Sequence, residues 1–131
     1  MSDVNGAMQR QSIKAADSER AEANLALFER LDFDGWNKRD WDLFRQLHGK
    51  AVKVGGFGQE TYNIDDHVAW AQQYLRDNPD NQIDAHPIAI GAGDWTAVTG
   101  VFNDGSTMAT IARWENGQVV EEYLFQLVTG H

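Results

Sequence analysis

Three stretches in the first 80 residues have apolar side chains at the three- and four-residue spacing of a helix. The first begins near Ser18, a residue that can cap a helix, and carries Leu25, Phe28, Leu31 and Trp36. Asp40 can cap a short second helix, and Asn63 can cap a third from about Asp65 to Asn78, with Asp66 as its capping-box partner. The apolar residues of the third helix are Val68, Trp70, Ala71, Tyr74 and Leu75.

The remaining pattern is one of short strands separated by turn residues. Strands are expected over residues 48–54, 82–90, 95–102, 107–115 and 118–127, and Asn116-Gly117 is a two-residue hairpin turn. Glycines 55, 56 and 58 form a loop after the first strand. This order predicts an α+β fold in which three N-terminal helices pack on one face of a strongly bent antiparallel sheet.

Length and composition narrow the function classes. The 131 residues suit one domain, expected over residues 18–131, after a polar and flexible arm over residues 1–17. Lysine and arginine number 11 against 20 aspartates and glutamates, and the net charge of −9 argues against nucleic acid and anionic membranes as partners. No apolar run reaches membrane-span length and no secretory signal precedes the domain, so a bacterial cytoplasmic location is expected.

The sequence carries no recognised cofactor or metal motif. Cysteine is absent, which excludes thiolate metal sites and cysteine nucleophiles. The four histidines show none of the spacings of metal sites, the glycines make no dinucleotide fingerprint, and no serine lies in a nucleophile elbow. We therefore expect neither a metal nor an organic cofactor.

Four stretches occur in the order typical of a known family: residues 33–42 (FDGWNKRDWD), 47–52 (LHGKAV), 64–75 and 111–123 (IARWENGQVVEEY). Over residues 21–127 the chain resembles the SnoaL-like polyketide cyclases of the nuclear transport factor 2-like superfamily. The resemblance implies a cone-shaped fold with a pocket between helices and sheet. Gly49 replaces the family's usual proline, Tyr123 its usual tryptophan, and no aspartate follows that aromatic residue, so a catalytic carboxylate must come from elsewhere.

Glu121 is the carboxylate that strand alternation favours as a general base. It shares a face with Val119 and Tyr123, where partial burial would raise its pKa. The alternative is an ion pair with Arg113 on the neighbouring strand. Glu122, on the opposite face, is expected to be solvated or at a subunit contact.

Two histidines are candidates for proton transfer. His48 stands at a strand entry, where it could shuttle protons or fix the corner by bonding to the backbone. His86 lies beside Pro87 on an edge or bulged strand and could face the pocket or solvent. Either His86 or Tyr123 could donate a hydrogen bond to an oxyanion, whereas His67 is expected on the surface.

Aromatic residues are numerous enough to line a flat apolar pocket, with core packing as the alternative for each of them. The candidate substrate-binding residues are Trp36, Trp70, Tyr74, Trp114 and Phe125. Because the last strands are apolar on both faces, a second copy of the chain is expected to cover the face without helices.

The leading hypothesis is a small enzyme that removes a proton next to a carbonyl group of an apolar ring compound: a cyclase, isomerase or dehydratase. Two alternatives stay open, a protein that binds a hydrophobic ligand without chemistry and a dimeric interaction domain. Because one fold hosts many activities, residues of the site must decide between them.

Overall fold

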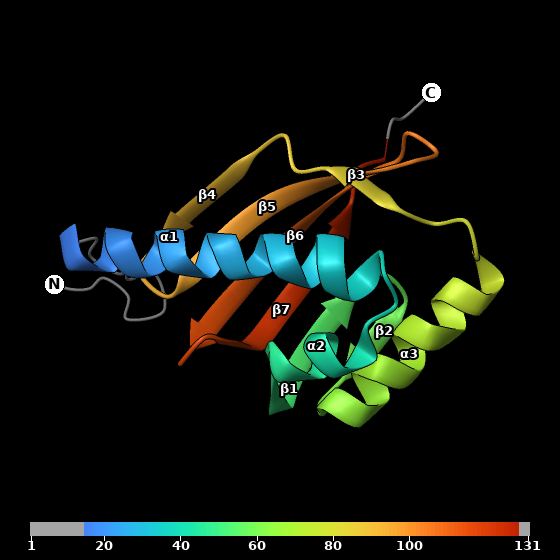
Figure 1. Ribbon diagram of the computed structural model, residues 1–131, viewed down its shortest axis with the longest axis horizontal. Helices are drawn as coiled ribbons and strands as arrows, with labels where there is room; N and C mark the ends of the chain where they lie inside the picture. Colours follow the sequence, from blue (N-terminus) through green and yellow to red (C-terminus); the bar gives the residue numbers. More distant parts are fainter. Residues whose placement is uncertain (1–14, 129–131) are drawn as a thin grey trace, which may run out of the picture.

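The computed structural model describes residues 15–128, in which three α-helices lie over one face of a curved sheet (Figure 1). Helix α1 spans Ala15–Glu29 and continues into a π-helix, η2, over Arg30–Trp36. Helices α2 and α3 span Trp41–Gln46 and Ile64–Asp77. The flexible arm was expected over residues 1–17. Residues 1–14 of it lie outside the described part of the chain, and residues 15–17 belong to α1.

Two of the three predicted helix caps are confirmed. The Asp40 side chain accepts a hydrogen bond from Leu43 N at the start of α2, and Asn63 accepts one from Asp66 N at the start of α3. Such bonds satisfy amides that have no partner inside the helix. Ser18, by contrast, lies inside α1, which begins three residues earlier than the sequence predicted.

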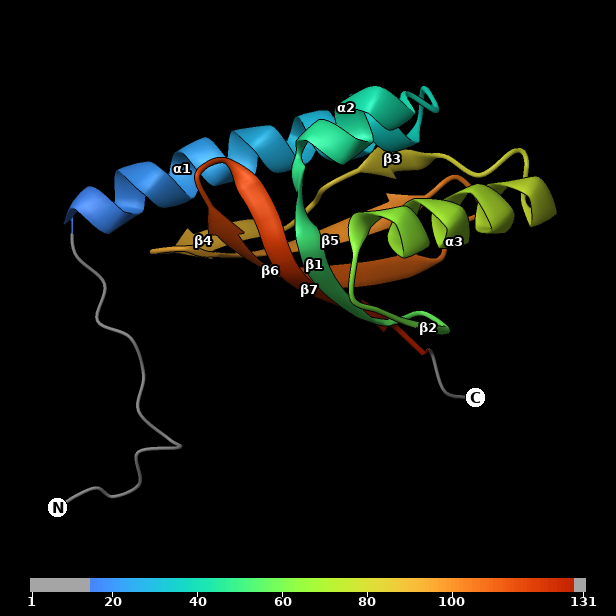
Figure 2. The same cartoon turned by 90° about the horizontal axis from the view of Figure 1, so that it is seen from below.

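The sheet has seven strands and is antiparallel except for one pair. Its order is β2-β1-β7-β6-β5-β3, with β4 also paired to β5, and β1 runs parallel to β7. Seen from below, all three α-helices lie on the same side of the curved sheet (Figure 2). The strands are β1 (His48–Gly56), β2 (Gln59–Thr61), β3 (Ile83–Ala85), β4 (Ala89–Ala92), β5 (Trp95–Phe102), β6 (Thr107–Glu115) and β7 (Gln118–Gln126).

The predicted strands 95–102 and 107–115 are confirmed, and the two differences lie at Pro87 and at the glycine loop. The expected strand 82–90 is divided into β3 and β4, because proline cannot donate to a ladder. The glycine loop forms a tight hairpin into β2, with positive φ at Gly56 and Gly58. Asn116 and Gly117 both have positive φ, as the predicted two-residue hairpin turn requires.

A β-bulge in β7 decides which side chains face the helices. Trp114 pairs with Val119 and Arg113 pairs with Glu121, so Val120 has no opposite residue on β6. One extra residue reverses the alternation beyond it. Val119 and Glu122 are therefore both buried, while Glu121 lies on the outer face.

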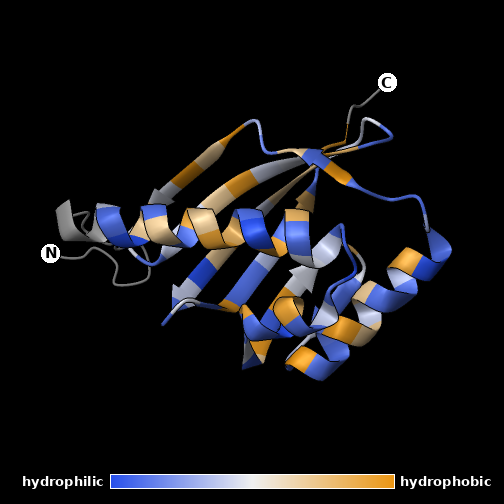
Figure 3. Cartoon of the chain, viewed as in Figure 1, coloured by the Kyte–Doolittle hydropathy of each residue, from blue (hydrophilic) through white to orange (hydrophobic). Residues whose placement is uncertain are grey.

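The core fills the space between the helices and the inner sheet face. Val52, Val54, Ala112, Trp114 and Val119 are almost completely buried there. Orange apolar segments alternate with blue polar ones along the helices and strands, as expected for elements buried on one side (Figure 3). Within residues 15–128 no helix is both long and apolar enough to span a membrane.

Candidate functional site

A cavity opens between the helices and the concave sheet face, with about 540 Å³ of space that includes its mouth. Most of its lining is apolar or aromatic, and a few ionisable groups converge in it. The apolar lining is Phe28, Leu31, Trp36, Phe44, Phe57, Trp70, Ile83, Phe102, Met108 and Leu124. The polar members are Asp32, His48, His67, Tyr74, Thr110 and Glu122. An apolar pocket with few convergent polar groups is the usual form of a small-molecule site.

Two histidines and a carboxylate meet in this cavity. Glu122 Oε1 lies 3.2 Å from His48 Nε2 and 3.1 Å from His67 Nε2. The side chains of the three residues are at most 5% exposed. Phe44 packs against both imidazole rings, with ring centroids 4.5 and 5.2 Å apart, and Trp70 stacks on His67.

Each member of this cluster comes from a different element. His48 is the first residue of β1, and its Nδ1 lies 2.6 Å from the carbonyl oxygen of Phe44 in α2. His67 lies on the buried face of α3, and its Nδ1 lies 2.9 Å from the side-chain oxygen of Gln59. Glu122 reaches the cavity because of the bulge at Val120. Local folding of all three elements thus fixes the ring orientations.

Burial and polar contacts have opposite effects on the pKa of Glu122 in this cluster. Burial alone would raise the pKa of Glu122, but hydrogen bonds and charge from His48 and His67 hold it well below the usual range for a glutamate. Burial lowers the pKa of His67, and the contact with Glu122 only partly opposes this effect. Glu122 is therefore an ionised carboxylate at neutral pH, held in an apolar cavity.

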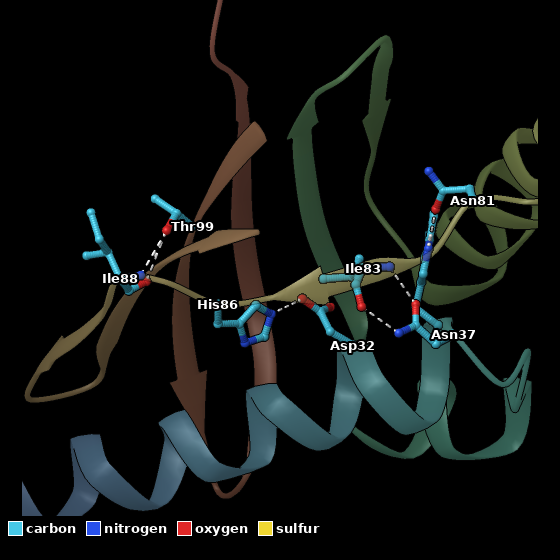
Figure 4. A network of polar contacts seen from close by, with 8 residues as sticks. Asp32, Asn37, Asn81, Ile83, His86, Ile88 and Thr99 are labelled. Atoms are coloured by element: carbon cyan, nitrogen blue, oxygen red, sulfur yellow. Dashed lines mark hydrogen bonds and ion pairs between the residues drawn. The ribbon is translucent and has the colours of Figure 1, made fainter. Parts of the chain in front are cut away.

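A second carboxylate of the cavity is Asp32, which pairs with His86. Asp32 Oδ2 lies 2.7 Å from His86 Nε2, and the two side chains point toward one another between η2 and the segment after β3 (Figure 4). The ring of His86 packs on Phe28 and Phe33, and its Nδ1 is buried without a protein partner. Burial raises the pKa of Asp32, and the contact with His86 opposes that rise.

The π-helix η2 positions Asp32. Its wide turn is closed by i→i+5 bonds, from Asn37 N to Asp32 O and from Asp40 N to Gly35 O. Asn37 then joins η2 to β3, because its side chain donates to Ile83 O and accepts from Ile83 N (Figure 4). Single π-turns of this kind are frequent at functional sites.

Replacing Asp32 with asparagine should change how stability depends on pH. Because the folded-state pKa of Asp32 is raised, its contribution to stability is present at low pH and is lost as the pH rises through that pKa. The free energy of unfolding of Asp32→Asn, relative to the unaltered chain, should therefore increase from pH 4 to pH 7. Urea unfolding at both values measures it, and a constant difference would contradict the raised pKa.

Four of the nine candidate residues line the cavity, and His86 lies just behind Asp32. His48, Trp36, Trp70 and Tyr74 are in the lining. His48 makes the backbone contact of the corner-fixing interpretation, to Phe44 O, while its role in proton transfer stays a prediction. Trp114 lies under the cavity in the core, where its indole donates to Thr96 Oγ1.

The other three candidates lie on the outer sheet face. Glu121 forms the ion pair with Arg113 that was the alternative interpretation, and its Oε2 accepts a hydrogen bond from Tyr123. Those two contacts, from Tyr123 first, lower the pKa of Glu121. Phe125 is 54% exposed. The bulge at Val120 accounts for the displacement of all three, because alternation in β7 is reversed beyond it.

Three residues of the site were missed or misplaced from the sequence. His67 was expected at the surface and Glu122 in solvent or at a subunit contact, yet both are buried in the cavity. A signal existed for His67, since it precedes Ala71 by four residues on the buried face of α3. Asp32 similarly follows Phe28 by four residues. No local signal marked Glu122, because the bulge depends on pairing with β6.

Comparisons with known proteins identify the fold. No family model matches the sequence, and no curated protein matches it. A solved structure from Kribbella flavida, named provisionally as a ketosteroid isomerase, has a TM-score of 0.73 at 20% identity, covering 85% of this chain and 82% of the other. A SnoaL-like protein of unknown function from Burkholderia thailandensis has a TM-score of 0.69 at 16% identity, covering 90% and 100%.

A third structure is provisionally named a SnoaL-like polyketide cyclase, from Jannaschia, and has a TM-score of 0.71 at 18% identity. It covers 91% of this chain and 90% of the other. The chain therefore has the cone fold of the SnoaL-like and ketosteroid-isomerase-like structures, as its sequence resemblance predicted.

Proposed function

We propose that this protein binds an apolar ring compound in its cavity and moves a proton next to a carbonyl group of that compound. The reaction would be a cyclisation, an isomerisation or a dehydration. The observation that carries the proposal is the pair of buried carboxylates, Asp32 and Glu122, in a cavity lined mainly by apolar and aromatic side chains. The provisional names of the neighbouring structures, a ketosteroid isomerase and a polyketide cyclase, agree with such chemistry.

The two carboxylates have different environments, and this difference supports different roles for them. Asp32 has a raised pKa, which brings it closer to neutral pH and makes it the better group for exchanging a proton with a substrate. His86 holds the carboxylate in place and can stabilise its ionised form. The cluster of Glu122, His48 and His67 lines the same cavity, where the charge of Glu122 adds to the effect of burial in raising the pKa of Asp32.

Tryptophan fluorescence tests the proposal, because Trp36 and Trp70 line the cavity. Steroids and anthraquinone-type polyketides should quench it saturably, whereas linear fatty acids should have less effect. Asp32→Asn should bind the same compounds within a few-fold. For steroid ketones, which carry hydrogen on the carbon next to the carbonyl group, it should slow proton exchange at that carbon by about 10²–10⁴-fold. Deuterium uptake followed by NMR measures that exchange.

Two results would change the proposal. Saturable binding with no deuterium uptake in the unaltered chain would favour a hydrophobic-ligand binding protein without catalysis. Absence of binding by every ring compound would contradict both functions and favour the interaction domain. Trp41→Phe is the matched control, because Trp41 does not line the cavity and its loss should leave the quenching unchanged.

The outer face of the sheet supports a homodimer as a second part of the proposal. Neighbouring strands place Ile90, Ala97, Ile111 and Tyr123 in one row across β4, β5, β6 and β7. Ile88, Ile90, Ile111, Phe125 and Leu127 are exposed. Contiguous exposed apolar surface of this kind marks an interaction site, and a second copy fits it by symmetry. A cytoplasmic location, and the absence of nucleic-acid and membrane partners, stay predictions.

A further inference from the structure

We infer that His48, His67 and Glu122 form a binding site for a first-row divalent transition-metal ion. The ligand atoms would be the two Nε2 atoms and Oε1, which all lie within 4.8 Å of one another. They come from β1, α3 and β7, so the folded chain brings together residues separated by up to 74 positions. This inference revises the expectation of no metal, which rested on short spacings in the sequence.

The hydrogen bonds behind the two imidazoles are those of metal ligands. A histidine that binds a metal through one nitrogen commonly donates its other N–H to a carbonyl or carboxylate oxygen. Nδ1 of His48 donates to the backbone oxygen of Phe44, an atom that can only accept. Nδ1 of His67 lies 2.9 Å from Oε1 of Gln59, which also accepts from Thr61 Oγ1, while Nε2 of the same amide is buried without a hydrogen-bond partner. In neutral rings held in this way, both Nε2 lone pairs point toward Glu122.

The distances within the cluster fit a shared ion. Zinc lies about 2.0–2.1 Å from nitrogen and about 2.0–2.2 Å from oxygen, so two such ligands are ~3.3 Å apart at a tetrahedral angle and ~2.9 Å apart at a right angle. The two nitrogen–oxygen distances are 3.2 and 3.1 Å. Both values lie inside that range and at the long end for hydrogen bonds.

Hydrogen bonding without a metal requires a less favourable arrangement. With both Nδ1 atoms donating, each ring would need a second proton on Nε2 to bond with Glu122. Two imidazolium ions would then lie with ring centroids 5.1 Å apart in an apolar cavity, sharing one carboxylate oxygen. A single divalent ion satisfies the same three atoms with both rings neutral.

The donor set defines the class of metal. Imidazole nitrogens with one carboxylate suit zinc, iron(II), cobalt(II) and nickel(II), and do not suit magnesium or calcium. All three ligands line the cavity, so further coordination positions are reached from it, as in catalytic rather than structural sites. There the ion would polarise a carbonyl oxygen, a role that rests on the proposed function, whereas metal binding itself does not.

The test uses the full chain, stripped with a chelator and titrated with Zn²⁺ or Co²⁺ alone, with no organic ligand. Calorimetry should show one ion bound per chain, and Co²⁺ should give the visible absorption of a low-coordinate nitrogen–oxygen site. Glu122→Gln and His67→Gln should weaken binding by more than about 100-fold, and Gln59→Leu by about 10–100-fold. Glu121→Gln is the matched control and should leave the affinity unchanged.

A measurement on the unaltered chain avoids variants that fail to fold. With Zn²⁺, the ¹⁵N resonances of two histidine Nε2 atoms should shift while their Nδ1 atoms stay protonated. Absence of saturable binding by either ion would overturn the site, as would equal affinity in folded Glu122→Gln. A failed ring-compound titration alongside intact metal binding would reject the proposed substrate and leave the metal site standing.

Discussion

Glu122→Ala is expected to lower the free energy of unfolding by about 3–5 kcal/mol, the range found when one partner of a buried charged pair is removed. The carboxylate is 4% exposed and bonds to His48 and His67, which its loss leaves without an acceptor in the cavity. Because folded domains have only about 5–15 kcal/mol of stability, the change is large. Urea unfolding with a chelator present measures it without a contribution from metal ions.

The neighbouring glutamate provides the comparison. Glu121→Ala removes an ion pair with Arg113 on the outer face, where solvent screens the charges and exposed pairs contribute about 0–1 kcal/mol. The two substitutions change the same residue type at adjacent positions of one strand. Equal losses in the two variants would contradict the placement of Glu122 in the cavity and the bulge that puts it there.

The Glu122→Ala substitution has a second consequence, which concerns the pKa of Asp32. The charge of Glu122 helps to raise the pKa of Asp32, so Glu122→Ala should bring that pKa back toward its usual range. Carboxyl resonances of Asp32 followed by NMR across acidic pH report the change. No shift in Asp32 would mean that the two carboxylates do not share one electrostatic environment.

Local interactions explain which elements could be predicted from the sequence. Helix α3 depends on Asn63 and Asp66 for its start, which are neighbours in the chain, and on apolar residues at helical spacing. The turn at Asn116-Gly117 is similarly set by two residues that tolerate positive φ. Such features need no knowledge of tertiary contacts, and the family resemblance added the cone fold that joins them.

The candidate site was harder to predict because the sequence of β7 allows two assignments of its inner and outer faces, and a single bulge decides between them. Strict alternation puts Glu121 on the face of Val119, whereas an unpaired Val120 puts Glu122 there. The choice is made by the register of pairing with β6 and by burial of Trp114 opposite Val119. A one-residue shift exchanges the whole set of inner and outer side chains.

His67 and Asp32 show a different limit. Each lies at helical spacing from apolar residues, a spacing that the buried face shares, but ionisable side chains are ordinarily solvated, and His67 was expected on the surface. Both are buried because partners from distant elements meet them: Glu122 and Gln59 for His67, and His86 for Asp32. The cost of burying a charge is offset only by contacts that the fold assembles, which the sequence does not display.

Ile111→Asp is expected to convert the proposed homodimer into monomers. Ile111 lies in the middle of the outer sheet face, between Ala97 and Tyr123, where a second copy would remove it from water. An unpaired carboxylate buried at the centre of an apolar interface costs several kcal/mol, and each ~1.4 kcal/mol weakens association about tenfold. The dissociation constant should therefore rise by about 10²–10³-fold, which sedimentation velocity over a range of protein concentrations measures.

Charge and position must be separated in this experiment, because each chain already carries a net charge of −9 and two copies repel one another. Ala26→Asp adds the same charge to an exposed position of α1, on the helix side of the sheet. Any increase in the dissociation constant that it causes should disappear when salt is added. The effect of Ile111→Asp should persist at high salt, because desolvation of the carboxylate causes it. If the unaltered chain sediments as a monomer at every concentration, the proposed homodimer is wrong.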